Sequence, residues 1–270
     1  MSVLVLAGWQ AGGVTVEHFD EWYSAMSAYP DARDALVHAH PGLPTEIRST
    51  SLLGMPGLLE VRDLLQLSAQ DVLVDLACGR GGYGLWLARE SDARVLGVDF
   101  SAVAIDLACQ NVARFGLTAA QANFRVGTLV ATGLPDGTAD ALVCIDAIQF
   151  ADDIVGAAAE FVRVVRPGGR VVLTCWEAID RGDHRVPQRM RRVDLAAQLT
   201  AGGLVEIRVV DRPTWLEVEH RIWSEAAALD PGDDPALQDL KTEAEQVLPT
   251  LGAMRRVLAS AVAPARPGSQ

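Results

Sequence analysis

Short apolar runs alternate with longer amphipathic stretches through the middle of the chain. Apolar runs of about five residues, bounded by polar residues or glycine, are typical of strands buried in a parallel sheet. The stretches between them repeat their apolar residues with helical spacing. This alternation predicts an α/β fold, in which helices cover both faces of a mostly parallel, doubly wound sheet. Strands are expected at Val72–Leu76, Arg94–Val98, Asn123–Val126, Asp140–Ile145, Arg170–Cys175 and Leu204–Val210.

Local signals mark the ends of the helices between these strands. Ser101 is a typical N-cap residue and should begin the helix that follows the second strand. The run Arg166-Pro167-Gly168-Gly169 predicts a turn before the fifth strand. The carboxyl ends of the parallel strands should then share one edge of the sheet, where ligands bind in such folds. Helices are expected at Gly82–Arg89, Ala102–Phe115, Asp152–Val165 and Val193–Thr200.

The N-terminal part of the chain, residues 1–69, predicts a helical cap. Its first helix, Glu17–Ser27, repeats aromatic and apolar residues at positions i, i+3, i+4 and i+7. Further helices are expected at Pro30–His40 and Gly57–Gln66. The apolar face of the first helix consists of Phe19, Trp22, Tyr23 and Met26.

The C-terminal part follows the core predicted for residues 70–212. Two helices, Trp215–Ala228 and Ala236–Leu248, lie within residues 213–252. The run Arg256–Ala263 has the composition of a strand, although a terminal helix fits its periodicity nearly as well. An antiparallel seventh strand in residues 253–270 would make the two helices an insertion that forms a lid.

Composition and charge limit the functional classes. The 270 residues include 50% hydrophobic and 21% charged side chains, and the net charge is -12. An acidic chain is a poor partner for nucleic acid, and the basic run Arg189–Arg192 is better explained as a solvated helix face. No apolar stretch is long enough to cross a bilayer. We therefore expect a small-molecule substrate, with no nucleic acid and no membrane.

The cysteines indicate a reducing, cytoplasmic compartment. None of the four forms a C-x-x-C pair, so neither a metal site nor a disulfide framework is expected. Most of them lie in apolar, strand-like runs, which predicts buried free thiols. The four residues are Cys78, Cys109, Cys144 and Cys175.

The strongest motif is the run VLVDLACGRGGYG at Val72–Gly84. A strand ends near Asp75, and a glycine-rich turn leads directly into a helix. Such a turn lets the backbone approach a ligand, and the helix N-terminus presents free N–H groups. Asp99 ends the next strand, where a carboxylate can accept hydrogen bonds from both hydroxyls of a ribose. A nucleoside cofactor is therefore expected.

Two kinds of nucleoside cofactor fit this turn. The literal pattern Gly79-x-Gly81-x-x-Gly84 matches a dinucleotide fingerprint and would suit NAD. Asp75, however, would repel a pyrophosphate and would suit a cofactor with an ammonium or sulfonium group.

Together these features resemble the class I S-adenosylmethionine-dependent methyltransferases, in particular those that act on small molecules. Asp75-x-Ala77-x-Gly79-x-Gly81 is similar to the family's acidic glycine motif, with Ala77 in place of its first glycine. Asp99 matches the ribose-binding acid, and Arg166–Gly169 resembles the turn before the family's fifth strand. The resemblance covers roughly residues 70–212. It implies a Rossmann-like fold, S-adenosylmethionine as cofactor and S-adenosylhomocysteine as product.

The resemblance also implies roles for individual residues. Gly79 and Gly81 would lie against the methionine part of the cofactor, and Asp75 would reach its ammonium group. Phe100 would cover the adenine, although ordinary core packing explains this residue equally well. The remaining cofactor contacts are expected from Ala77, Thr128, Leu129 and Asp146.

The catalytic residues are less constrained. Many family members have a histidine shortly after the fourth strand, and Phe150 occupies that place here. Asp146 and Glu177 follow the ends of strands four and five, so they are the preferred candidates for a base. The weaker candidates are His18, His184 and the phenol of Tyr23.

Aromatic residues outside the central fold predict the acceptor site. Trp22, Tyr23, Trp176 and Trp223 would form the walls of a cleft for a small, largely apolar acceptor that is uncharged or cationic. The expected function is methyl transfer to oxygen, nitrogen or carbon in specialised metabolism, by a possible homodimer. The alternatives are a fold member without methyl transfer, such as a cyclase or binding module, and an NAD-dependent oxidoreductase.

Overall fold

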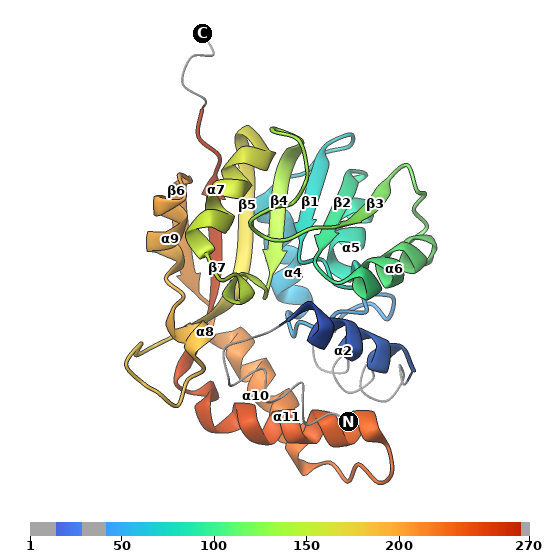
Figure 1. Cartoon of the computed structure of the whole chain (residues 1–270), viewed down its shortest axis with the longest axis vertical. Helices are drawn as coiled ribbons and strands as arrows, with labels where there is room; N and C mark the ends of the chain where they lie inside the picture. Colours follow the sequence, from blue (N-terminus) through green and yellow to red (C-terminus); the bar gives the residue numbers. More distant parts are fainter. Residues whose placement is uncertain (1–14, 29–41, 266–270) are drawn as a thin grey trace.

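The computed structural model describes residues 15–28 and 42–265. Seven strands form one sheet in the order β3-β2-β1-β4-β5-β7-β6 (Figure 1). The neighbours from β3 to β5 are parallel, whereas β7 runs antiparallel to both β5 and β6. This confirms the predicted doubly wound, mostly parallel sheet. The strands are β1 Val72–Leu76, β2 Arg94–Asp99, β3 Ala122–Val126, β4 Ala139–Ile145, β5 Val165–Ala178, β6 Val205–Asp211 and β7 Met254–Val262.

The last strand settles the choice between strand and helix at the C-terminal end. β7 lies between β5 and β6 and pairs with β5 from Arg170↔Val262 to Ala178↔Met254. Both of its edges are hydrogen-bonded, and Val257, Leu258 and Ala259 are buried. A strand in this position is stabilised by two neighbours, which a terminal helix would lack.

Helices cover the two faces of the sheet. Successive residues of a strand point to opposite faces, so Leu73 and Val74 contribute to different core clusters. The cluster that contains Leu73 packs against α4 and α5, and the cluster that contains Val74 packs against α7 and α9. The helices are α2 Val16–Ala28, α4 Met55–Leu65, α5 Gly82–Ser91, α6 Ala102–Asn111, α7 Ile154–Val164, α8 Gln188–Arg191, α9 Leu195–Ala201, α10 Pro213–Ala228 and α11 Pro235–Leu251.

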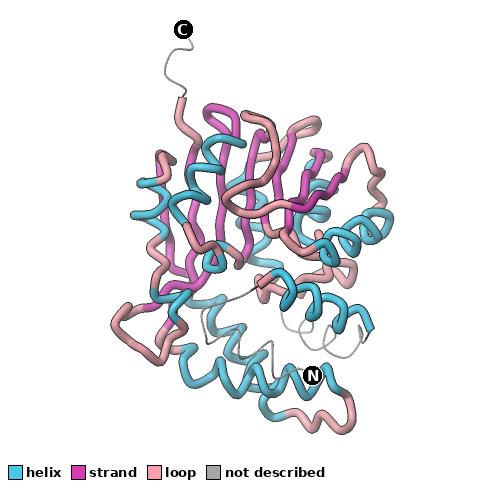
Figure 2. The backbone as a smooth tube through the Cα atoms, viewed as in Figure 1, coloured by secondary structure: helices cyan, strands magenta, loops and turns pink. Residues whose placement is uncertain are grey.

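The helices α10 and α11 form the predicted insertion between β6 and β7. They pack against each other through a third apolar cluster that contains Ile222, Trp223 and Leu240. Figure 2 shows them joined by a loop, and in Figure 1 they lie at the same end of the sheet as α2. The helices before and after the core therefore meet at one end of the strands.

Two local expectations differ from the structure, and a third concerns residues that the structure does not describe. The predicted helix Ala102–Phe115 divides into α6 and a 3-10 turn, η1, at Val112–Phe115. The predicted turn at Arg166–Gly169 is an irregular part of β5, where the register with β4 shifts and the Gly168 N–H donates to the carbonyl of Ala263. Gly168 has a φ of +78°, which lets the strand bulge instead of reversing. The helix predicted at Pro30–His40 lies outside the described residues.

The cysteines differ in burial. Cys144 and Cys175 are buried, Cys78 is half-buried and Cys109 is exposed on α6, so the expected burial does not extend to Cys109. Within the described ranges, His, Cys, Asp and Glu form no cluster of three or more that could hold a metal ion. No helix in the described part of the chain is long and apolar enough to cross a membrane.

Candidate functional site

The glycine-rich turn after β1 is held in left-handed backbone conformations. The φ angles are +54° at Ala77, +53° at Gly79 and +77° at Gly81. A Cβ added at Gly79 would lie 2.7 Å from the Tyr23 phenolic oxygen, so α2 closes directly over this glycine. Gly81 precedes the first residue of α5 as its N-cap. The turn therefore presents bare backbone beneath the aromatic face of α2.

Asp75 lies behind this turn. Its side chain is buried, and Gly84 leaves the space that the Asp75 carboxyl occupies. Burial raises the pKa of Asp75 to about 8, and the charge of Asp99 raises it further, although the Gly84 N–H opposes both. The ligand-free site thus favours a neutral Asp75 at pH 7. A cation placed nearby would favour the ionised form.

Asp99 ties the end of β2 to the glycine-rich turn. Its Oδ2 accepts the Gly79 N–H at 2.9 Å, and its Oδ1 accepts the Ser101 N–H at 2.9 Å. Burial raises the pKa of Asp99 to about 6, while these backbone donors lower it. The Phe100 N–H is a third backbone donor that lowers the pKa of this carboxyl. A carboxylate has about four lone-pair positions, so Asp99, which lines the cavity, keeps room for a ligand hydroxyl.

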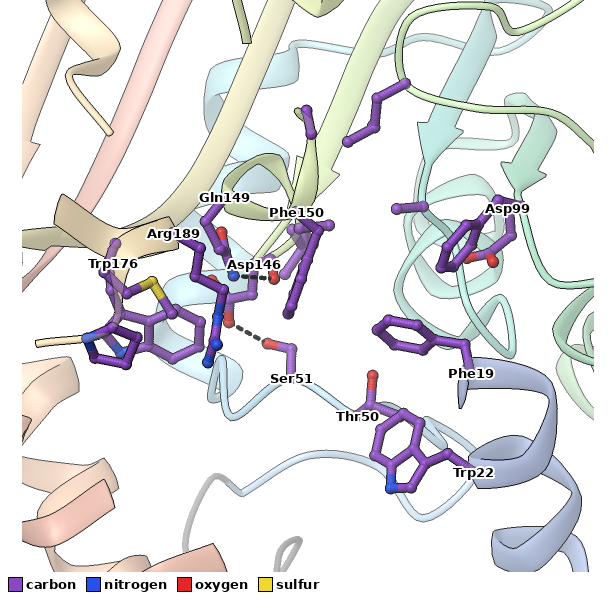
Figure 3. A pocket seen from close by; sticks show the side chains of 18 of the residues that line it. Phe19, Trp22, Thr50, Ser51, Asp99, Asp146, Gln149, Phe150, Trp176 and Arg189 are labelled. Carbon is purple, nitrogen blue, oxygen red and sulfur yellow. Dashed lines mark hydrogen bonds between the residues drawn. The ribbon is translucent and has the colours of Figure 1, made fainter. Parts of the chain in front are cut away.

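A cavity of about 450 Å³ extends from Asp99 to the insertion helices. Figure 3 shows Asp99 and Phe19 on one side, and Trp176 and Arg189 on the other. Asp99, Gly127 and Thr128 line the side near β2, whereas the far side is mostly aromatic and aliphatic. The far side is lined by Leu52, Trp176, Met190, Trp223, Val247, Leu251 and Met254.

Phe19 marks the boundary between the two sides. Its ring centroid is 5.0 Å from that of Phe100 and 5.7 Å from that of Phe150, both edge-on. It also contacts Trp22 and Tyr23 of its own helix. This aromatic group joins α2 to the ends of β2 and β4, so the cavity is partly covered by a helix from outside the sheet.

A buried charge network forms the floor of the far side. The guanidinium of Arg256 on β7 donates to both carboxylate oxygens of Asp146, at 2.5 and 2.9 Å. The Ser51 hydroxyl and the Thr174 hydroxyl also donate to Asp146, at 2.5 and 2.6 Å. These four bonds use the accepting capacity of the carboxylate. They also hold Asp146 at a φ of +55°, a backbone conformation that is uncommon for aspartate.

Glu219 of α10 completes this network. It forms an ion pair with Nε of Arg256 at 2.6 Å, and its other oxygen accepts the indole N–H of Trp176 at 2.8 Å. Burial raises the pKa of Glu219 to about 7, although Arg256 lowers it. The Arg256 guanidinium lies 4.0 Å from the centroid of the Trp176 ring. Trp176 is thus held in the cavity wall by Arg256 of β7 and by Glu219 of α10.

The comparisons with known proteins agree with this geometry. A methyltransferase domain model matches residues 74–173. The chain is 31% identical to the sterol 24-C-methyltransferase of Aspergillus fumigatus over 130 residues, which is 48% of this chain and 34% of that enzyme. It is 25% identical to the 2-methyl-6-phytyl-1,4-hydroquinone methyltransferase of Synechocystis over 82% of this chain and 76% of that enzyme. The chain therefore spans about a third of the length of the sterol methyltransferase.

Solved structures share the fold over nearly the whole chain. Phosphoethanolamine N-methyltransferase 2 of Haemonchus contortus matches with a TM-score of 0.69 and 16% identity, over 94% of this chain and 61% of that chain. The 4+2 cyclase SpnF matches with a TM-score of 0.68 and 19% identity, over 93% of this chain and 97% of that chain. The matched model and the shared fold make the chain similar to the class I S-adenosylmethionine-dependent methyltransferases. The matched residues include the glycine-rich turn around Gly79.

The residues predicted to bind the cofactor occupy two places in the structure. Asp75, Gly79 and Gly81 shape the turn but do not line the cavity. Thr128 also closes its own loop, because its N–H donates to the Ala131 carbonyl and its hydroxyl accepts the Ala131 N–H. Direct contact with the cofactor stays a prediction for each of them. The predicted residues that do line the cavity are Ala77, Asp99, Phe100, Thr128, Leu129 and Asp146.

The residues predicted to bind the acceptor all lie at the cavity. Trp22 and Tyr23 enter from α2, Trp176 from β5 and Trp223 from α10. Their lining positions support the prediction without testing it. Trp215, in contrast, packs against the position of Gly57 and over Arg212, away from the cavity lining.

The structure places both preferred catalytic candidates in ion pairs. Asp146 lines the cavity, but its oxygens are occupied by Arg256, Ser51 and Thr174, so it has no free position to accept a proton. Glu177 does not line the cavity, because its oxygens accept the Leu195 N–H and the guanidinium of Arg255. Both carboxylates hold elements of the fold together.

The weaker candidates fit no better. Neither His18 nor His184 lines the cavity. Tyr23 does, but burial raises the pKa of its phenol well above the usual range, which makes it a poor base at neutral pH.

Several residues at the site were missed by the sequence interpretation. Phe19 was assigned only to the apolar face of a helix, although aromatic residues on that face already pointed to the cavity. Arg256 and Glu219 gave no signal, because a lone arginine in a strand and a glutamate in an amphipathic helix are ordinary. Arg189 was included in a run interpreted as solvated.

Proposed function

We propose that this chain binds S-adenosylmethionine and transfers its methyl group to a small, largely apolar acceptor in specialised metabolism. The observation that supports this proposal is one continuous cavity, which begins at Asp99 and ends among aromatic residues of the insertion helices. One ligand with ribose hydroxyls and a second apolar ligand can therefore meet in it. The hydroquinone and sterol methyltransferases that resemble the chain have apolar acceptors in their names.

The residues of the first side fit this cofactor. Asp99 would accept its ribose hydroxyls, and Phe100 would lie against its adenine. The buried Asp75 carboxyl would face its ammonium group, directly or through the turn at Gly79. Bound there, the cofactor supplies an electrophilic methyl group on a sulfonium.

The chain's own contribution to the reaction is orientation and the exclusion of water. The walls that contain Trp176 and Phe19 would align the acceptor's nucleophilic atom with the methyl group, and such alignment alone can lower a barrier substantially. Because the Asp146 carboxylate is bonded to Arg256, Ser51 and Thr174, the acceptor's own acidity would set how its proton leaves. This proposal favours acceptors that are already nucleophilic at neutral pH.

A second candidate function is a cyclase or binding role without methyl transfer. The occupied carboxylate of Asp146 and the phenylalanine at position 150 favour it, because both remove a proton acceptor from the cavity. The fold is shared almost completely with the cyclase SpnF. Fold alone does not separate these functions.

A turnover assay separates the candidates. Thermal shifts should first show stabilisation by S-adenosylmethionine and S-adenosylhomocysteine but not by NAD, since only ligands of the native state raise the melting temperature. A panel of phenolic, terpenoid and amine acceptors is then incubated with the cofactor. Methyl transfer appears as an acceptor one methyl heavier together with S-adenosylhomocysteine. Acceptor conversion without a mass gain would favour the cyclase.

The pH dependence of stability tests the environment of Asp75. Its pKa of about 8 lies far above the value near 4 expected in the unfolded chain, so the folded state binds a proton more tightly between these values. Stability from this group is therefore lost as pH rises from about 4 to 8. Relative to Asp75→Asn, the ligand-free wild type should lose at least about 3 °C in melting temperature between pH 5 and pH 8.

Differential scanning fluorimetry measures this difference, and the exposed Asp63→Asn provides the control. A gap between wild type and Asp75→Asn that is constant with pH would show that Asp75 is ionised throughout. Saturating S-adenosylmethionine should reduce this loss of melting temperature with rising pH, because an adjacent ammonium favours the ionised carboxylate.

Trp223 tests the role of the lid. Trp223→Ala removes an aromatic wall of the acceptor side, so the KM for an acceptor found in the panel should rise about tenfold or more, with little change in cofactor affinity. Trp215→Ala makes the same change on α10 outside the cavity lining and should lower the melting temperature without this selective effect. Equal losses of acceptor and cofactor affinity in Trp223→Ala would instead indicate a packing role.

We further propose that the enzyme works in the cytoplasm, with homodimerisation left open as in the sequence prediction. The support is that Cys78, Cys109, Cys144 and Cys175 are free thiols in the described structure. Light scattering of the purified chain tests the oligomeric state.

A further inference from the structure

Arg189 is the one basic side chain among the described residues that line the cavity. It belongs to α8, a single turn that follows the loop after β5. The sequence pattern predicted a solvated face for this basic run, but Arg189 is half-buried and faces the acceptor side (Figure 3). A guanidinium in a wall made largely of tryptophan, methionine and aliphatic residues needs a functional explanation.

Contacts of its neighbours fix α8 in this orientation. Met190 is buried in the lid cluster, and Arg191 donates to the Val186 carbonyl at 3.0 Å. Arg192 donates to the Ala151 carbonyl at 2.7 Å, which ties α8 to the loop after β4. The guanidinium of Arg189 itself lies 5.5 Å from the centroid of the Phe150 ring. Arg189 is therefore held against the aromatic residue that replaces the family's histidine.

Arg189 shares its side of the cavity with the acidic Glu243, and Arg192 adds a second positive charge nearby. Burial lowers the pKa of Arg189 to about 10, and the carboxylate of Glu243 on α11 opposes this effect. Glu243 lines the same side of the cavity. The other acidic groups there are engaged elsewhere: Asp146 is bonded to Arg256, Asp152 forms an ion pair with Arg192 at 3.7 Å, and Asp153 caps α7. A guanidinium in such surroundings gains from an additional anion.

We propose that the acceptor is an apolar molecule with one anionic group, a carboxylate or a phosphate, and that Arg189 binds this group. This inference rests on the proposed function, because it assigns the substrate class of the same cavity. It replaces the expectation of an uncharged or cationic acceptor. Glu243 then acts as the counter-ion of Arg189 in the empty site and is displaced by the acceptor anion. The apolar body of the acceptor would lie between Trp176 and Trp223.

Binding of matched probes tests the proposal without methyl transfer. The three probes share one butylphenyl body: para-butylbenzoate, para-butylphenyl phosphate and the neutral para-butylbenzamide. Affinities are measured by calorimetry at pH 7.5 in saturating S-adenosylhomocysteine, with protein of confirmed melting temperature. The wild type should bind at least one anion about ten- to a hundredfold more tightly than the amide, the range expected for a charged hydrogen bond. The tighter anion identifies carboxylate or phosphate.

Four variants should change the preference for the anion over the amide in different ways. Arg189→Met should abolish the preference by weakening the anion alone, and Arg189→Lys should retain part of it. Glu243→Gln should strengthen anion binding several-fold, because the competing carboxylate is gone. Arg185→Met changes an exposed arginine of the preceding loop, outside the cavity lining, and should leave the preference unchanged.

Two results would overturn the proposal: no anion preference in the wild type, or an undiminished preference in folded Arg189→Met. If Arg189→Met does not fold, the Arg189→Lys and Glu243→Gln pair decides in the same way. Failure of S-adenosylhomocysteine to bind would count against the proposed function instead. Methyl transfer to neutral acceptors, without anion preference, would overturn this inference alone.

Discussion

Replacing Arg256 with methionine is expected to lower the free energy of unfolding by about 3–5 kcal/mol. Arg256 is fully buried and forms ion pairs with two buried carboxylates, Asp146 and Glu219. Removing the shared cation leaves both carboxylates without their compensating charge, which costs more than the lost attraction. Urea unfolding followed by fluorescence measures the change.

Comparison variants separate this effect from the loss of any arginine. Arg62→Met removes a surface ion pair with Asp63 and should change stability by less than about 1 kcal/mol. Arg256→Lys keeps the charge but not the bidentate hydrogen bonds to Asp146, so an intermediate loss in the free energy of unfolding is expected. The triple variant Arg256→Met, Asp146→Asn and Glu219→Gln should regain part of the stability, because no unpaired charge remains. Stability within 1 kcal/mol of wild type in Arg256→Met would show that water already compensates these carboxylates.

Replacing Asp99 with alanine is expected to weaken cofactor binding about ten- to a hundredfold. The change removes the acceptor for the ribose hydroxyls, and a hydrogen bond to a charged group is worth roughly 1.5–3 kcal/mol. It also frees the N–H groups of Gly79 and Ser101, which Asp99 holds in the ligand-free protein. Calorimetry with S-adenosylhomocysteine measures the loss.

Two further variants distinguish ribose binding from support of the turn. Asp99→Asn retains one oxygen for the backbone donors. It should still bind S-adenosylhomocysteine more weakly than the wild type, but its melting temperature should fall less than that of Asp99→Ala. Asp106→Ala, at an exposed position on α6, should leave both quantities unchanged. If Asp99→Ala bound S-adenosylhomocysteine as tightly as the wild type, the ribose assignment would be wrong.

The local sequence pattern was enough to predict the strands of the parallel core. The strands from Val72 to Ile145 were predicted to within about one residue, because each is a short apolar run between polar ends. The glycine turn and Asp99 were placed correctly at the ends of adjacent strands for the same reason. Arg256–Ala263 was ambiguous, since a segment buried on both faces has no polar period to distinguish strand from helix. Its pairing with both β5 and β6 decided the conformation.

The candidate site divides in the same way. The sequence determined that residues at or next to the carboxyl ends of strands, such as Asp75, Asp99 and Asp146, lie near the ligand edge, because parallel strands bring those ends together. Their chemistry was not. The Asp146 carboxylate is paired with Arg256, which lies 110 residues away in the sequence. The two meet only because β7 returns antiparallel beside β5. The inward orientation of Arg189 likewise depends on the packing of Met190 beneath the lid, a contact that no local pattern encodes.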